Sequence, residues 1–545
     1  MCGIICLIKF NDKIDQLEAV SCCQKLLKRG PDRYNYEIFK IDCGEIFMGF
    51  TRLAIMDTSD AGLQPFTNDH SSIICNGEIY NYIELAQHHQ IETKTSCDCE
   101  VLLPLAEKVG FKQMVQTELD GEFATVYYDQ KNSIVYAARD RYGVRPLYYG
   151  YNNRTKTIGF ASELKALHPI MDVVYQVKPN QILSVKLVQD DLDNVVSMDD
   201  LICATEYFDY NKLVTDKLNY MTDVELVQNL VRDRFTQAVK KRLCADRPIG
   251  FLLSGGLDSS LVVAIATKIL GPEKIVCFSV GMEGSPDIEA SKKVVQYLGI
   301  KQHHIIPFTV QKGLDSLTDV IRTIETYDIT TIRASTPQYI MAKYINENTD
   351  IKVILSGEGS DEIHGSYKYM RFAPTEDEFH DETIRLLSEL YYFDNLRTDR
   401  TMAGYGLEVR VPFLDHEYVK LVANIHPKLL MYREDYIEKK IIRDSFKGLL
   451  PEEILYRPKE AFSDAVSSND VNWYKSVAKL ADTMISNEEL YTNPYKMNVP
   501  KSKESLLYRR IFNSIYPNRD TILPHFWLPT FPRGNNITDP SATVL

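Results

Sequence analysis

Strand-like and helix-like segments alternate along the second half of the sequence, and this alternation restricts the possible folds more than any other feature. A helical spacing of apolar residues from Val224 to Leu243 is followed by apolar runs typical of buried strands, at 248–253, 274–280, 303–308 and 351–356. Helix-like segments lie between the first three runs, at 260–270 and 289–299. Because strands connected through helices lie parallel in one sheet, we predict a doubly wound α/β fold here. Such sheets bind ligands at the carboxyl ends of their strands.

The first part of the chain, to about residue 200, follows another pattern. It consists of short strand-like runs that are separated by turn residues, at 45–50, 71–76, 122–129, 133–140 and 157–162. The polar, acidic stretch 186–200 is expected to be an edge or a linker. Because 545 residues exceed one ordinary core, we predict two domains, at 2–200 and 210–545.

The composition disfavours several classes of function. A formal net charge of −13 argues against general binding to nucleic-acid phosphates, so no nucleic-acid partner is expected. No apolar run approaches the roughly 20 residues that span a bilayer, and no signal peptide is visible, so we expect no membrane association. The 11 cysteines show no disulfide framework, which favours a reducing, cytoplasmic compartment.

The second residue is a cysteine, in the opening sequence MCGIIC. If Met1 is removed, Cys2 carries a thiol nucleophile and a free α-amine, a possible general base, on one residue. A cysteine at this position can also be an accident of a small second residue. Other residues have to decide between the two interpretations.

The segment LLSGGLDSS (252–260) lies between an apolar strand and a helix. Its two glycines permit a sharp turn, and the backbone N–H groups and the helix N-terminus attract anions. Ser254, Ser259 and Ser260 can donate hydrogen bonds, and Asp258 can hold a cation. This combination suits pyrophosphate and Mg²⁺, although no G-K-[ST] follows as in the Walker loop. The alternative is a glycine turn that only connects strand to helix.

The motifs of the second half resemble those of asparagine synthetases. SGGLDSS is similar to the pyrophosphate loop of the ATP-pyrophosphatase superfamily, which activates carboxyl groups by adenylylation. The segment at 354–367 (ILSGEGSDEIHGSY) resembles the partner motif of asparagine synthetases, and the segment at 324–339 resembles the lining of their aspartate pocket. Segments 405–416 (YGLEVRVPFLDH) and 457–464 (RPKEAFSD) complete the set.

The motifs of the first half resemble the class II, N-terminal nucleophile (Ntn) glutamine amidotransferases. They are Cys2 itself, KRGPD (28–32), FTRLAIMD (50–57), CNGEIYNY (75–82) and SCDCE (96–100). The resemblance implies an N-terminal α-β-β-α Ntn-type glutaminase sandwich over 2–200. It also implies a C-terminal doubly wound, parallel-sheet ATP-pyrophosphatase domain over 210–545.

The resemblance assigns roles in the first domain residue by residue. Cys2 would attack the side-chain amide of glutamine and form a thioester, and the Asn76 side chain and the Gly77 N–H would hold the oxyanion. Arg52 would bind the α-carboxylate of glutamine, while Glu78 and Asp98 would take its α-ammonium. The backbone of Leu53, Ala54, Ile55 and Met56 would line the same pocket.

The resemblance also assigns residues in the second domain. Arg333 would hold a carboxylate of aspartate, Glu358 would support adenylylation and later proton removal, and Asp258 and Asp361 would bind Mg²⁺. ATP and pyrophosphate would be bound by Leu253, Ser254, Gly255, Gly256, Asp258, Ser259, Val280, Ser356, Gly357 and Lys459. The implied enzyme is an animal-type, glutamine-hydrolysing asparagine synthetase, a ligase that uses ATP and Mg²⁺ through β-aspartyl-AMP. A homodimer is expected from the family.

Two alternatives stay open from sequence. One is a related enzyme that adenylylates a different carboxylate or forms a β-lactam, although β-lactam-forming synthetases lack the N-terminal cysteine. The other is a non-catalytic protein that kept the fold, which would be expected to lose residues such as Cys2 or Asp258. His364, in the variable part of the second loop, is given no role.

Overall fold

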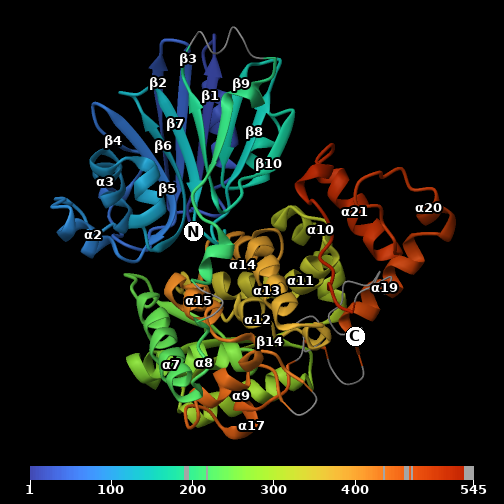
Figure 1. Cartoon of the computed structure of the whole chain (residues 1–545). Coiled ribbons are helices and arrows are strands. Elements are labelled where there is room, and N and C mark those ends of the chain that lie inside the picture. Colours follow the sequence, from blue (N-terminus) through green and yellow to red (C-terminus); the bar gives the residue numbers. More distant parts are fainter. Residues whose placement is uncertain (189–195, 216–218, 434–435, 460–465, 468–470, 533–545) are drawn as a thin grey trace.

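The computed structural model describes residues 1–188, 196–215, 219–433, 436–459, 466–467 and 471–532. The central part of the predicted linker at 186–200, the end of the motif at 457–464 and the last residues of the chain lie outside these ranges. Figure 1 shows two stacked parts, with the N-terminal sheets above and the C-terminal helices around a further sheet below. No helix in the described ranges is long and apolar enough to cross a membrane.

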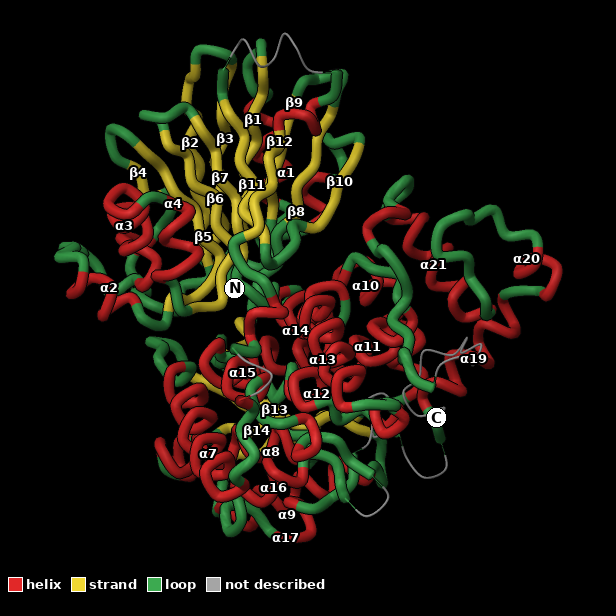
Figure 2. The backbone as a smooth tube through the Cα atoms, in the orientation of Figure 1, coloured by secondary structure: helices red, strands yellow, loops and turns green. Residues whose placement is uncertain are grey.

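The N-terminal part contains two antiparallel sheets that pack face to face (Figure 2). The first has the order β10-β8-β9-β1-β3-β2 and the second the order β12-β11-β7-β6-β5-β4. The strands of the first sheet are β1 (Gly3–Phe10), β2 (Arg33–Ile41), β3 (Gly44–Arg52), β8 (Tyr148–Asn152), β9 (Thr157–Ala161) and β10 (Val173–Gln176). Those of the second are β4 (Phe66–Thr67), β5 (Ser71–Ile79), β6 (Gly121–Asp129), β7 (Ile134–Arg139), β11 (Gln181–Lys186) and β12 (Ile202–Glu206).

Strand β1 shows why these runs are apolar on both faces. Ile4 and Ile8 point into the core between the two sheets, whereas Ile5 and Leu7 pack on the other face with residues of a helix. The helices that cover the sheets are α1 (Gln16–Gln24) and α5 (Leu164–Leu167) on the first, and α2 (Tyr82–His88), α3 (Leu102–Val109) and α4 (Phe111–Gln113) on the second. The predicted α-β-β-α sandwich is therefore confirmed.

The C-terminal part contains a parallel sheet with the order β15-β14-β13-β16-β17. Its strands are β13 (Ile249–Leu252), β14 (Val276–Gly281), β15 (Gln302–Pro307), β16 (Val353–Leu355) and β17 (Glu408–Arg410). The first four correspond to the predicted runs, and the predicted parallel α/β fold is confirmed. The fifth strand, β17, was not predicted, because three residues with charge at both ends give no strand signal.

Helices surround this sheet and extend from it. They are α7 (Val224–Lys241), α8 (Leu257–Leu270), α9 (Pro286–Leu298), α10 (Val310–Ile324), α11 (Ile329–Asn348), α12 (Ser360–His364), α13 (Glu376–Glu389), α14 (Asp394–Ala403), α15 (His416–Ala423), α16 (Lys440–Ser445), α17 (Glu452–Leu455), α19 (Trp473–Met484), α20 (Asn487–Tyr491) and α21 (Lys503–Ile515). Helices α8 and α9 pack on β13 and β14, and α14 packs on β17 beneath the N-terminal sheets. The first residues of the chain thus lie close to the C-terminal part.

Candidate active sites

Cys2 lies at the start of β1, where the two parts of the chain meet. Its thiol donates a hydrogen bond to the Leu53 carbonyl at 3.6 Å, and Arg29 Nε donates to the Cys2 carbonyl at 2.9 Å. Burial raises the pKa of the Cys2 thiol to about 11 and lowers the pKa of the Met1 α-amine to about 6. The thiol is therefore neutral at pH 7 and needs a base to become a nucleophile.

The segment after β3 carries Arg52 and the four residues predicted to line the glutamine pocket. The Arg52 guanidinium is buried and donates to the backbone carbonyls of Met56, Asp57 and Ser59. Leu53, Ala54, Ile55 and Met56 are buried as well. The Asp32 carboxylate, from the KRGPD motif, accepts a hydrogen bond from the Ala54 N–H at 2.8 Å. The turn at Asp32 thus holds the pocket segment in place.

Asn76 and Gly77 lie on β5 in the second sheet. The Asn76 side chain is fully buried, and within the described residues neither its Nδ2 nor its Oδ1 has a hydrogen-bond partner. A buried amide without a partner costs free energy, so such a group marks a place where a ligand can supply the missing bonds. A Cβ atom at Gly77 would lie 2.2 Å from the Glu122 carbonyl oxygen, so a side chain is excluded there.

Two carboxylates, Glu78 and Asp98, are buried beside this strand. Asp98 accepts a hydrogen bond from the Ile79 N–H at 2.7 Å, and burial raises its pKa to about 6. Burial also raises the pKa of Glu78, with Asp98 and Glu408 adding to the effect. Glu78 Oε2 lies 3.1 Å from Nη2 of Arg410, a residue of the C-terminal part. Burial leaves the charges of these carboxylates poorly compensated, so a nearby cation would favour their ionised forms.

The loop between β13 and α8 holds the SGGLDSS motif. Gly255 has φ +76°, and a Cβ atom there would lie 2.5 Å from the Ser291 backbone nitrogen, so only glycine fits. The hydroxyl groups of Ser254 and Ser259 lie 3.1 Å apart, and the Gly256 N–H donates to Ser254 Oγ at 3.2 Å. Gly256 is the N-cap residue of α8 and makes no side-chain cap. The first N–H groups of this 14-residue helix therefore have no side-chain cap to compete with an anion.

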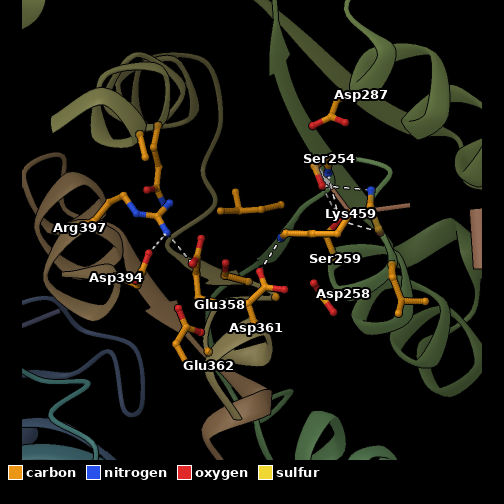
Figure 3. A pocket seen from close by; sticks show the side chains of 18 of the residues that line it. Ser254, Asp258, Ser259, Asp287, Glu358, Asp361, Glu362, Asp394, Arg397 and Lys459 are labelled. Atoms are coloured by element: carbon orange, nitrogen blue, oxygen red, sulfur yellow. Dashed lines mark hydrogen bonds and ion pairs between the residues drawn. The ribbon is translucent and has the colours of Figure 1, made fainter. Parts of the chain in front are cut away.

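The second loop, between β16 and α12, lies next to the first. Ser360 Oγ donates to Asp258 Oδ1 at 2.7 Å and so joins the two loops. The ammonium of Lys439 lies 2.7 Å from Asp258 Oδ1 and 2.7 Å from Asp361 Oδ1. Lys459 Nζ contacts the other oxygen of Asp361 at 2.5 Å. Figure 3 shows Lys459 and Asp361 pointing toward each other. These two lysines hold the pKa of Asp361 far below its usual range.

A second charged group lies on the other side of the same cavity. Arg397 Nη2 contacts Glu358 Oε2 and Asp394 Oδ1, each at 2.7 Å (Figure 3). Burial raises the pKa of Glu358 and Arg397 opposes this shift. Arg333, the predicted aspartate ligand, also lines the cavity, and its Nε and Nη2 donate to the Glu504 carboxylate at 2.8 and 2.7 Å. Arg333 and Arg397 are two of the four arginines that line the cavity; the others are Arg443 and Arg457.

The cavity has a volume of about 210 Å³ and opens at the carboxyl ends of the parallel strands. All residues that the resemblance assigns to the second domain line it except Gly255, whose backbone shapes the loop. Ser260, also considered as a donor, is buried and does not line the cavity. The assigned residues that line it are Leu253, Ser254, Gly256, Asp258, Ser259, Val280, Arg333, Ser356, Gly357, Glu358, Asp361 and Lys459. The structure therefore brings these predicted residues together in one place.

The predicted ligands of Mg²⁺ are the carboxylates of Asp258 and Asp361. The described residues contain no group of three or more histidine, cysteine or acidic side chains arranged to hold a metal ion. Asp258 and Asp361 nevertheless direct one oxygen each at a single cation, the Lys439 ammonium. Two carboxylates fit Mg²⁺, which commonly takes one or two of them and completes its shell with substrate phosphates and water.

Several charged residues of these sites were not predicted from sequence. They are Arg29, Lys439, Arg397 and Arg410. Arg29 and Arg410 lie inside the quoted motifs KRGPD and LEVRVP, so the motifs themselves were a signal. Lys439 and Arg397 lie in helix-forming stretches that look like ordinary charged surface. The partners of Lys439 are 181 and 78 residues away, and Arg397 contacts Glu358, 39 residues away, besides its near neighbour Asp394.

The chain matches two family models. Residues 1–204 match a glutamine amidotransferase domain, and residues 230–377 and 371–525 match asparagine synthase. The chain is 61% identical to a protein of Acanthamoeba polyphaga mimivirus named probable asparagine synthetase (glutamine-hydrolysing), with 100% of both chains covered. It is 39% identical to Rattus norvegicus and Homo sapiens proteins named asparagine synthetase (glutamine-hydrolysing), over 100% of this chain and 98% of each relative. The similarity to these relatives therefore runs from end to end.

Proposed function

Because the chain belongs to the asparagine synthetase family, we propose that it makes L-asparagine from L-aspartate, ATP and the amide nitrogen of L-glutamine. The products besides asparagine are glutamate, AMP and pyrophosphate. One observation carries the proposal beyond the family match: a half-buried Cys2 thiol and a buried Asn76 amide without a partner among the described residues occur in the same chain as a cavity lined by the SGGLDSS loop and Glu358.

The first site hydrolyses glutamine. With Met1 removed, Cys2 carries the free α-amine, and an α-amine with an ordinary pKa of about 8 is partly neutral at pH 7. The neutral amine can take the thiol proton, so the thiolate attacks the glutamine amide and forms a thioester. Asn76 Nδ2 and the Gly77 N–H stabilise the oxyanion, an effect worth about 3 kcal/mol for one donor. Water then releases glutamate.

Three charged residues orient glutamine in this scheme. Arg52 binds the α-carboxylate, and Glu78 and Asp98 bind the α-ammonium. The placement of the two carboxylates supports this role, because both are buried and their pKa values are raised. A bound ammonium group would lower these pKa values again. The backbone of residues 53–56 forms the wall of the pocket.

The second site activates aspartate. The loop at 254–259 binds the phosphates of ATP through the N-terminus of α8 and its serine hydroxyls, and Leu253 and Val280 contact the adenosine. Gly357 and Ser356 contact the nucleotide from the second loop. Mg²⁺ held by Asp258 and Asp361 would supply positive charge to the phosphates. Lys459 adds a positive charge on the same side, since it already contacts Asp361.

Glu358 and Arg333 act on aspartate in this proposal. Arg333 orients a carboxylate of the substrate, and adenylylation of the other gives β-aspartyl-AMP. Ammonia from the first site attacks this intermediate, and Glu358 takes the proton. A raised pKa suits Glu358 to this step, because a carboxylate with higher proton affinity is a better base.

We further propose the domain limits 2–200 and 210–545, a reducing cytoplasmic location and a homodimer. All 11 cysteines have free thiols, which supports a reducing compartment. The homodimer rests on the family resemblance alone. Light scattering of the purified protein tests it directly, and a mass equal to one chain would contradict it.

The proposed function is tested with purified protein and two variants. The protein should form asparagine from aspartate, ATP and glutamine, and Cys2→Ala should lose glutamine-dependent synthesis while synthesis from ammonium persists. Asp258→Ala should lose ATP-to-pyrophosphate conversion and keep glutaminase activity. If Cys2→Ala lost both syntheses equally, the two-site scheme would be wrong, and unchanged synthesis by Asp258→Ala would refute the loop assignment.

A further inference from the structure

Arg410 is buried at the end of β17, and its side chain points toward the glutamine site. Its Nε donates to Glu408 Oε1 at 2.8 Å, and its Nη1 donates to the carbonyls of Arg242 and Cys244 at 3.0 and 2.6 Å. The remaining nitrogen, Nη2, makes no hydrogen bond within the described residues and lies 3.1 Å from Glu78 Oε2. Four contacts thus fix the guanidinium against a carboxylate of the first site.

The main chain of the same residue belongs to the second site. Strand β17 pairs with β16 so that Arg410 lies opposite Leu355, and the Ser356 N–H donates to the Arg410 carbonyl at 3.0 Å. Ser356 begins the loop that carries Gly357, Glu358 and Asp361. One residue therefore contacts the synthetase loop through its backbone and the glutamine site through its side chain.

The next residue reinforces this connection. Glu78 on β5 lies opposite Glu122 on β6, and the Val411 N–H donates to Glu122 Oε1 at 3.2 Å. Glu122 is also held by Arg242 Nε at 2.8 Å and lies 3.1 Å from Arg145 Nη2. Arg410 and Val411 thus contact two carboxylates that are neighbours across one pair of strands. A displacement of β17 would therefore change the contacts of both carboxylates, Glu78 and Glu122.

Electrostatics gives Arg410 a specific effect on Glu78. Glu78 is buried among two other carboxylates, Asp98 and Glu408, and these repel its charge. Arg410 opposes this repulsion and favours the ionised form. Only an ionised Glu78 attracts the α-ammonium of glutamine.

We propose that Arg410 is a positioning residue for glutamine: it holds the Glu78 carboxylate in place and couples the glutamine site to the synthetase loop at 356–361. This inference rests on the proposed function, because it takes Glu78 as a ligand of the α-ammonium. Coupling of this kind is reciprocal. If ATP and aspartate change the affinity for glutamine, glutamine changes their affinity by the same factor.

The test compares variants in two assays, glutamate release from glutamine and asparagine synthesis from ammonium. Arg410→Met should raise the KM for glutamine about ten- to hundredfold, within the usual range of site coupling, while kcat for glutamate release changes less than about threefold. Any response of the glutamine KM to ATP and aspartate should disappear. Arg410→Lys should recover part of the affinity, because it restores a charge without the planar fork.

Arg519→Met is the matched control. Arg519 also joins the two parts of the chain, since it donates to His168 Nδ1 and to backbone carbonyls of residues 168, 171 and 172, but it lies away from both sites. Loss of this arginine should leave the glutamine KM within about twofold of the unmodified protein. An equal rise of KM in both variants would mean that Arg410 acts through the general stability of the interface.

A double-mutant cycle keeps the inference falsifiable if Arg410→Met folds poorly. Glu78→Gln removes the charge that Arg410 supports, so Arg410→Lys should raise the glutamine KM much less in that background than alone. Additive effects would overturn the inference, as would an unchanged KM in Arg410→Met or an equal loss of ammonium-dependent synthesis. Failure of the unmodified protein to release glutamate or form asparagine would instead contradict the proposed function itself.

Discussion

Lys439 is the residue for which the structure makes the sharpest prediction. Its ammonium is 2.7 Å from an oxygen of Asp258 and 2.7 Å from an oxygen of Asp361, and its side chain is only 2% exposed. Replacing it by Met keeps the length of the side chain and removes the charge. Asp361 keeps Lys459 at 2.5 Å, but Asp258 then has no cation in the described contacts and keeps only the Ser360 hydroxyl.

The expected cost follows from this asymmetry. Removing one partner of a buried ion pair lowers the free energy of unfolding by about 3–5 kcal/mol. Because Asp361 keeps Lys459, we expect Lys439→Met to lower it by about 3 kcal/mol, the lower end of this range. Mg²⁺ without nucleotide should restore part of this loss, since two carboxylates then converge on a position without a cation. It should stabilise the unmodified protein less, because the ammonium has to be displaced first.

Urea unfolding followed by tryptophan fluorescence measures this effect. Both tryptophans, Trp473 and Trp527, lie in the C-terminal part and are buried, so the signal reports on that part alone. Lys241→Met is the matched control, because Lys241 also bridges two aspartates, Asp120 and Asp415 at 2.6 and 3.0 Å, but is 30% exposed. Lys241→Met should lower the free energy of unfolding by about 1 kcal/mol. Equal stabilisation of all three proteins by Mg²⁺, or no loss in Lys439→Met, would refute the reasoning.

Three further predictions concern single residues. Gly255→Ala should abolish pyrophosphate formation and leave glutaminase activity intact, because the added Cβ atom would lie 2.5 Å from the Ser291 backbone nitrogen. An assay of pyrophosphate release measures this effect, and release at the normal rate would contradict the close fit. The pKa of Asp98 is raised to about 6, so below that pH Asp98 gains a proton and the KM for glutamine should rise, whereas Asp98→Asn should show a high KM without this pH dependence. Arg29→Met should lower the free energy of unfolding by about 3 kcal/mol, since it removes the partner of the buried Asp399 at 2.7 Å and leaves that carboxylate with Arg400 at 3.3 Å. A loss below about 1 kcal/mol would argue against the ion pair with Arg29.

Much of the fold could be predicted because local signals agree with the final structure. The strands β13, β14 and β15 are short apolar runs next to helices with helical periodicity. Burial on both faces explains the absence of alternation in β14 and in the centre of β13, whereas the edge strand β15 is largely exposed. Strand β17 escaped prediction because its pairing with β16 joins segments that are more than 50 residues apart. Its glutamate and arginine are buried as an ion pair with each other, and Arg410 also contacts Glu78 of the N-terminal part. Its strand conformation is a tertiary effect.

The residues of the candidate sites also fall into those that local sequence predicts and those that it does not. Residues at strand ends and in glycine loops were predicted, since a loop such as 253–259 carries its chemistry in consecutive positions. Lys439 was not, because it contacts Asp258 and Asp361 across 181 and 78 residues of sequence. The ion pair between Arg333 and Glu504 spans 171 residues and is likewise invisible from either segment alone. The charge balance inside the cavity therefore required the structure.

The buried charges between the two parts of the chain fix their relative position more than they add to stability. Arg29 contacts Asp399 at 2.7 Å, Arg242 contacts Glu122 at 2.8 Å, and each of these side chains is at most 2% exposed. Desolvation offsets most of the attraction in such pairs, so apolar side chains of similar volume would give a comparably stable contact. A displacement of one part along the other, however, would leave several charges buried without partners, each at a cost of several kcal/mol. An apolar surface has no such penalty. The charged contact therefore holds the glutamine site and the synthetase loop at one fixed separation, which coupling through Arg410 requires.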